Sequence, residues 1–161
     1  MAPGAQASAP PTTVSNRGGP SFGPGTILAL LGAAAIVVSI FVAWFDYSKG
    51  AVSTSANAGD VPVQFLVDNQ VEWISSISII VLLAPAAALL VIGALVAKAR
   101  VLGVIGGAVA IIVTVLYSIQ WQRIIDDKGM SFGLTDLIGI GVYVAVVGGI
   151  VGLVGSLLPR R

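Results

Sequence analysis

Residues 26–45 read TILALLGAAAIVVSIFVAWF, and no charged side chain interrupts them before Asp46. An α-helix rises about 1.5 Å per residue, so this stretch spans about 30 Å, the thickness of the hydrocarbon core of a bilayer. The block is longer than the apolar region of a secretory signal peptide, and no small-residue cleavage site follows it. We therefore expect a retained transmembrane helix over residues 26–45.

Three further apolar blocks cover residues 73–97, 101–120 and 137–158, and the pattern predicts a transmembrane helix in each. Only residues 98–100 join the second and third blocks, which forces an antiparallel helical hairpin. Pro85 lies in the middle of the second block. We expect it to bend this helix without breaking it, because neighbouring helices in lipid can shield the freed carbonyl.

The overall composition agrees with a membrane protein. Of the 161 residues, 57% are hydrophobic and only 9% are charged, whereas a soluble domain carries about 25% charged residues. Residues 1–24 are rich in Pro, Gly and Ala, and their only charge is Arg17, which is typical of a disordered tail. The expected fold is therefore all-α: a four-helix transmembrane bundle over residues 25–161, preceded by this tail.

The predicted helix ends carry capping residues. Asn69 and Glu72 have the spacing of a capping box just before the second block. Thr135 or Asp136 can cap the start of the fourth block, and Pro159 stops it.

Charge distribution predicts the orientation. The tail, residues 98–100 and the C-terminal end carry five Lys or Arg residues and no acid, whereas loops 46–72 and 121–136 carry three Lys or Arg residues and all seven acids. The positive-inside rule then places both termini in the cytoplasm of a multi-pass plasma-membrane protein. Trp44, Trp73 and Trp121 fall at the outer block ends, which predicts an aromatic belt at the outer interface.

The outer loops offer two further patterns. Apolar residues alternate over residues 61–68, which predicts a short strand. The acids of the two loops could meet and hold Ca²⁺, but solvated loop charge is the more common reading of such acids. We therefore expect no metal and no cofactor.

The chain offers few of the residues that enzymatic catalysis commonly uses. It contains no His and no Cys, and no ionisable residue lies inside an apolar block away from its ends. Intramembrane charges usually mark proton relays, ion paths and substrate sites. No phosphate-binding loop, dinucleotide motif or basic stripe for nucleic acid is present. We therefore expect a non-enzymatic protein that does not bind nucleic acid.

Small residues follow one face of the fourth block. Gly148, Gly152 and Ser156 have the spacing of a small-xxx-small ridge, and Gly141 and Ala145 extend it. Such ridges let helix backbones approach closely in lipid. The ridge predicts either packing within the bundle or contact with a second copy or another membrane subunit.

Some local sequences resemble a known group. Ala43–Asp46, Gly139–Tyr143, the pair Gly148 and Gly149, and residues 157–161 resemble small four-helix membrane proteins common in actinobacteria. This resemblance implies a bacterial plasma membrane and no particular activity. The topology is also similar to that of claudins, but the paired cysteines of the claudin first loop are missing, so no claudin function is implied.

These observations favour an accessory or scaffold subunit that acts through protein contacts in the cell envelope. Its expected contact surfaces are the outer loops and the small-residue ridge of the fourth block. The alternative is an oligomeric transport or channel component, with a pore lined by backbone, Ser and Thr.

Overall fold

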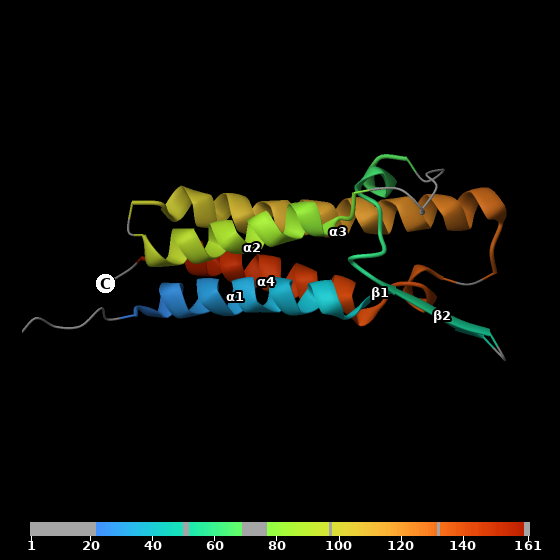
Figure 1. The fold of residues 1–161 in the computed structure, drawn as a ribbon, viewed down its shortest axis with the longest axis horizontal. Helices are drawn as coiled ribbons and strands as arrows, with labels where there is room; N and C mark the ends of the chain where they lie inside the picture. The colour runs from blue at the N-terminus through green and yellow to red at the C-terminus, as the bar shows by residue number, and fades with distance from the viewer. Residues whose placement is uncertain (1–21, 50–51, 69–76, 97, 132, 160–161) are drawn as a thin grey trace, which may run out of the picture.

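The computed structural model describes residues 22–49, 52–68, 77–96, 98–131 and 133–159. These residues form four α-helices and one two-stranded sheet (Figure 1). The helices are α1 (Pro24–Phe41), α2 (Ile80–Leu95), α3 (Arg100–Lys128) and α4 (Ile140–Leu157). The start of α1, the α2–α3 turn and the end of α4 lie at one end of the bundle, and the sheet lies at the other (Figure 1).

The four helices form a closed ring. Helix α1 packs on α2 and α4, and α3 packs on the same two neighbours. At the end where α1 begins and α4 ends, the Arg100 guanidinium donates to the Ser156 carbonyl and ties α3 to α4. The predicted helical hairpin of α2 and α3 is thus one side of an up-and-down bundle.

Glycines set the distance between helices. A Cβ built on Gly32 in α1 would lie 2.5 Å from the Gly148 carbonyl oxygen and 2.5 Å from the Gly152 Cα. Ordinary contact begins near 3.4 Å. The backbones of α1 and α4 therefore touch where only hydrogen atoms separate them.

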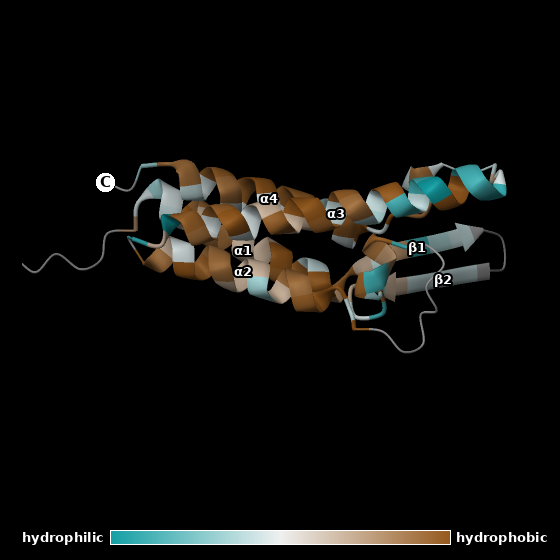
Figure 2. Ribbon diagram, turned by 90° about the horizontal axis from the view of Figure 1, so that it is seen from above, coloured by the Kyte–Doolittle hydropathy of each residue, from teal (hydrophilic) through white to brown (hydrophobic). Residues whose placement is uncertain are grey.

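Large apolar side chains lie on the outside of the bundle as well as in its interior. Alanines and glycines line much of the interior, including Ala29, Ala33 and Ala110, while large apolar residues such as Val101 and Val147 are exposed. The apolar colouring extends around all four helices, and hydrophilic residues gather toward the far end of α3 and on the sheet (Figure 2). Three helices, α1, α3 and α4, are long and apolar enough to cross a membrane, and α2 is a shorter apolar helix.

The first predicted helix is wrong at its C-terminal end. Helix α1 stops at Phe41, four residues before the predicted end at Phe45, because the chain enters strand β1 (Ala43–Lys49). The antiparallel partner of β1 is β2 (Val52–Asn57). Backbone pairing between these strands outweighs the continued hydropathy of the sequence. At its other end α1 begins at Pro24, a residue assigned above to the tail.

The predicted strand at residues 61–68 is also wrong. Val63–Leu66 form a 3₁₀ helix, η1, which follows Pro62. Proline has no N–H to donate to a ladder, and Phe65 and Leu66 are both buried, so the apparent alternation does not place alternate residues on two faces. The pattern reflects a buried turn.

The second and third predicted helices have shifted bounds. Residues 77–79 are not helical, because the Ile79 N–H donates to the Val61 carbonyl and the Val63 N–H to the Ile77 carbonyl in a short bridge. Helix α2 therefore begins at Ile80, and it continues through Pro85 without a break. The predicted start at Trp73 and the capping box of residues 69–72 lie outside the described residues.

Helix α3 continues to Lys128, eight residues beyond the predicted end at Gln120, and Gly129 terminates it in the left-handed conformation with φ of 57°. Hydropathy alone could not predict this extension, because its polar residues lie beyond the apolar block. Helix α4 begins at Ile140, three residues after the predicted start at Leu137. It follows a short 3₁₀ helix, η2 (Leu134–Asp136). Asp136 accepts a bond from the Gly133 N–H in that turn, so it caps η2 and not α4.

Candidate functional site

A bulge at Trp44 lies at the end of the bundle that carries the sheet. Ala43 pairs with Asn57 and Phe45 pairs with Ala56, so Trp44 is an extra residue in β1. A bulge redirects a side chain, and the Trp44 ring is fully buried, where its Nε1 donates to the Ser39 carbonyl at 2.7 Å. Trp44 is therefore not at an exposed interface, in contrast to the predicted belt.

The bulge also joins the connection between α1 and α2 to the connection between α3 and α4. The Trp44 carbonyl accepts bonds from the Gly139 N–H at 2.9 Å and from the Tyr117 hydroxyl at 3.1 Å. The Asp46 N–H donates to the Leu137 carbonyl at 3.0 Å. These bonds attach the segment before α4 to β1, and they attach both to α3.

An aromatic cap closes the bundle below these strands. We define it as Trp44, Phe45, Phe65, Tyr117 and Trp121. Phe45 stacks on Trp121 with ring centroids 4.8 Å apart, and Tyr117 lies edge-on to Trp44 at 5.3 Å. The aromatic cap therefore holds β1, η1 and α3 together, through ring contacts that favour offset and edge-to-face geometry.

Gln120 adds a polar link to this cap. Its side-chain amide is buried and donates to the Leu66 carbonyl at 3.1 Å. Buried polar groups need such partners, because an unpaired one costs about 1–3 kcal/mol. The first outer loop is thus fixed to α3 by a specific bond as well as by packing.

Beyond the bulge, β1 separates an apolar groove from a polar cleft. Successive strand residues point to opposite faces. Phe45 lines a groove of about 190 Å³ with Trp121, Met130 and Leu137, whereas Asp46 lines a cleft of about 550 Å³. Tyr47 borders both.

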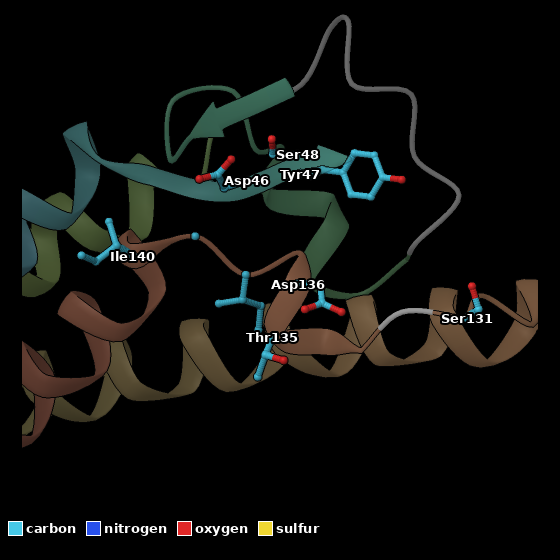
Figure 3. Close-up of a pocket in the computed structure, with 9 residues that line it drawn as sticks. Asp46, Tyr47, Ser48, Ser131, Thr135, Asp136 and Ile140 are labelled. Carbon is cyan, nitrogen blue, oxygen red and sulfur yellow. The ribbon is translucent and has the colours of Figure 1, made fainter. Parts of the chain in front are cut away.

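We call the polar cavity the outer cleft. Its walls are β1 and the connection between α3 and α4, which face each other in Figure 3. The cleft is lined by Asp46, Tyr47, Ser48, Ser131, Thr135, Asp136, Ile138, Gly139 and Ile140.

The outer cleft offers acceptors and no cationic side chain among these lining residues. Asp46 and Asp136 supply a carboxylate from each wall, and Ser48, Ser131 and Thr135 supply hydroxyls. One oxygen of Asp136 accepts the Gly133 N–H at 2.9 Å, which orients that carboxylate. Such a surface can bind a cationic or hydroxylated group.

The calcium hypothesis is answered only in part. The outer cleft brings together one acid from each outer loop, Asp46 and Asp136. Among the residues that the structure describes, no three acidic side chains come close enough to hold a metal ion. Glu72 lies outside those residues.

The predicted small-residue ridge lies inside the bundle. Gly141 faces the Trp44 ring, Gly148 faces α1, and Gly152 faces the Leu90 side chain of α2. The other two ridge residues, Ala145 and Ser156, are fully buried. The helices of this chain itself therefore occupy the ridge.

The remaining predicted belt residues are placed as follows. Trp121 is half-buried beneath Phe45, and Trp73 lies outside the described residues. The Trp121 Nε1 atom is buried, and it has no hydrogen-bond partner among the residues that the structure describes. Trp121 thus belongs to the aromatic cap as much as to any interface.

The outer cleft was not predicted from the sequence, although the sequence contains one indication of it. Asp46 is the first acid after the first apolar block, and Asp136 is the last acid before the fourth. No protein-family model, curated protein or solved structure matches this chain. What the protein does is therefore inferred from its own residues.

Proposed function

We propose that this chain is a non-enzymatic integral membrane protein, an accessory or scaffold subunit that contacts a partner in the cell envelope through its outer end. The observation that supports this proposal is the division of the molecule into an apolar helical bundle and a bonded end beside the sheet. Its helices expose large apolar side chains, and its two outer connections are bonded to one another and to α3 at Trp44.

Membrane insertion is supported by the outward-facing residues. Large apolar side chains that are at least 44% exposed occur on every helix, including Leu31, Val81, Ile112 and Val147. In water, each exposed apolar Å² costs about 25 cal/mol, so such a surface would favour aggregation. In lipid it is the ordinary surface of a bundle whose helices pack through small residues.

Charge supports the orientation proposed from the sequence. Lys98 and Arg100 lie at the end of the bundle where α1 begins and α4 ends. The described acids belong to β1, to the turns after β2 and η1, to the far end of α3 and to η2. We therefore propose that the end with the sheet faces outward and that both termini are cytoplasmic.

The outer end suits protein contact because its backbone is held in place. A preorganised surface loses less entropy on binding than a loose loop. The Trp44 carbonyl, the Asp46 N–H and the Gln120 amide hold β1 and its neighbours in one arrangement. The small-residue ridge is occupied within the chain, so the outer end is the better candidate contact surface.

Transport through a single copy finds little support in the bundle interior. Ile36, Leu83 and Leu90 are fully buried there. The Thr114 and Ser156 hydroxyls each donate to a carbonyl one turn earlier in their own helix. A transport function would therefore need several copies, with a pore between them.

Site-specific photo-cross-linking in native membranes tests the proposed function. A photoreactive residue at Thr54, exposed on β2, should capture one partner protein in near-stoichiometric yield. The same residue at Ile105, exposed on α3, is the matched control and should capture none. Equal capture at both positions, or ion flux through liposomes that contain only this protein, would contradict the scaffold proposal.

A further inference from the structure

We propose that the free edge of strand β2 binds an extended segment of the partner protein, which joins the sheet as a third strand. This inference deepens the scaffold proposal and rests on it, because it names the kind of segment that the end with the sheet would bind. It is argued from the register of the two strands and from the exposure of β2.

The register shows which backbone groups of β2 point away from β1. The Asp46 N–H donates to the Leu137 carbonyl and therefore points away from β2. Asp46 lies opposite Ser55, so the N–H and C=O groups of this pair face outward on both strands. The pattern repeats at every second residue, and Ser48 opposite Ser53 is the next such pair.

The edge of β2 is closed at one end and open beyond it. At the closed end, the Asn57 N–H donates to the Asp60 carboxylate at 3.0 Å, and the Asn57 carbonyl accepts from the Asp60 N–H at 3.1 Å. Ser53 and Ser55 are exposed, and among the described elements only β1 packs closely on β2. Within the part of the chain that the structure describes, nothing bonds to the outward N–H and C=O groups of these two serines.

Strand β2 lacks the features that usually protect an edge from pairing. Natural edge strands are blunted by charged side chains, by proline or by a bulge. Residues 52–57 read VSTSAN, without a charge or a proline, and the bulge of this sheet lies in β1. The open edge is therefore a template for another strand.

The spacing of the open groups selects an extended chain. Ser53 and Ser55 are two strand residues apart, which is about 6.8 Å, and each offers one backbone donor and one acceptor. An extended segment presents donors and acceptors at the same repeat, so it can satisfy all four groups. A helix cannot do so, because its own backbone bonds use these groups.

The direction of β2 favours a different protein over a second copy of this chain. Both strands run more along the bundle than across it (Figure 1, Figure 2). Copies inserted in the same direction in one membrane are related by rotation about its normal, so their β2 strands would run parallel. Antiparallel pairing, the more stable arrangement per residue, is therefore open to a segment of another protein.

Photo-cross-linking in native membranes with the photoreactive residue at Thr54 tests the pairing. Ser55→Pro removes an outward N–H and no bond to β1, so the hairpin should stay folded while capture of the partner falls at least tenfold. Ser55→Ala removes the hydroxyl but keeps the N–H, and Ser48→Pro removes the matching N–H at the opposite edge. Both controls should keep capture within twofold of the wild type.

Amide hydrogen exchange of the wild-type chain gives a second measurement that does not depend on the folding of a variant. The Ser53 and Ser55 amides should exchange at least tenfold more slowly in native membranes than in the chain purified in maltoside micelles, because the partner strand accepts from them. The Ser48 amide should exchange equally in both.

The outcomes separate this inference from the scaffold proposal. Capture that persists in a folded Ser55→Pro variant, or equal exchange of the Ser53 and Ser55 amides in both samples, would overturn the strand pairing and leave the scaffold proposal standing. A captured species with twice the mass of this chain would identify a second copy as the occupant and would also overturn it. Absence of any capture at Thr54 in the wild type would refute both.

Discussion

Replacing Gly32 by alanine should weaken the contact between α1 and α4. The new Cβ would lie 2.5 Å from the Gly148 carbonyl oxygen and 2.5 Å from the Gly152 Cα, about 1 Å inside ordinary contact. Both neighbours are backbone atoms of a helix, so neither can rotate away. The two helices must therefore separate along their closest contact.

The expected magnitude follows from two opposing effects. Overpacking of this kind costs about 1–3 kcal/mol, and a backbone clash belongs at the upper end of that range. Alanine is a better helix former than glycine by about 1 kcal/mol, which offsets part of the cost. The net loss is about 2 kcal/mol in the free energy of unfolding, or roughly 30-fold in the unfolding equilibrium constant.

Two variants serve as comparisons. A Cβ on Gly152 would meet the Leu90 methyl groups at 2.7 and 2.8 Å. Those atoms end a flexible side chain that can shift, so Gly152→Ala should be close to neutral. Ala34→Leu enlarges an exposed residue on the same helix as Gly32 and should also be close to neutral.

Unfolding in mixed micelles by increasing mole fraction of dodecyl sulfate, followed by circular dichroism, measures these differences. Gly32→Ala should unfold at a clearly lower mole fraction than Gly152→Ala and Ala34→Leu. If Gly32→Ala matches the wild type, or if Gly152→Ala is the more damaging of the two glycine variants, the close approach of α1 and α4 is refuted.

Three further predictions concern the outer end and the topology. Tyr117→Phe removes the hydroxyl that donates to the Trp44 carbonyl and should lower the free energy of unfolding by about 1 kcal/mol, measured by the same titration; an unchanged midpoint would show that this bond contributes nothing. Gly129→Ala places a Cβ at φ of 57° and should cost about 1–2 kcal/mol, while Gly129→Asn should cost less, since asparagine tolerates that conformation; equal losses would contradict the left-handed C-cap. The chain has no Cys, so in intact cells a membrane-impermeant maleimide should label Ser131→Cys, and it should label Lys98→Cys only after permeabilisation; labelling of both in intact cells would contradict the proposed orientation.

Local hydropathy predicted the helices well wherever apolar residues continue without interruption along the chain. Each of the four apolar blocks overlaps one of the helices α1 to α4. Helix formation satisfies backbone groups within one segment, so its signal is present in consecutive residues. The long third helix kept its helical pairing for eight residues past the apolar block, because its backbone bonds do not depend on the surrounding solvent.

Strands and the site could not be predicted in the same way. The residues Ala43–Phe45 are as apolar as the helix before them, and their extended conformation depends on pairing with β2 and with the segment at Ile138. Phe45 and Ile138 lie about 90 residues apart in the chain, and a pairing over that separation leaves no local periodicity. The outer cleft depends on those same pairings. Asp46 and Asp136 therefore line a common cleft only in the folded structure.

For this protein, the order of charge and hydropathy along the chain alone determined that there are four apolar segments, joined in antiparallel order, with every acid between the first and second or the third and fourth. Tertiary structure decided the rest: that the glycine ridge of α4 faces inward, that Trp44 is a buried bulge residue, and that one acid from each outer connection borders a common cleft. The physical reason is the separation along the chain over which each kind of interaction acts. Hydropathy and helix bonding act between residues a few positions apart, whereas helix faces, bulges and clefts are set by which distant backbones come into contact.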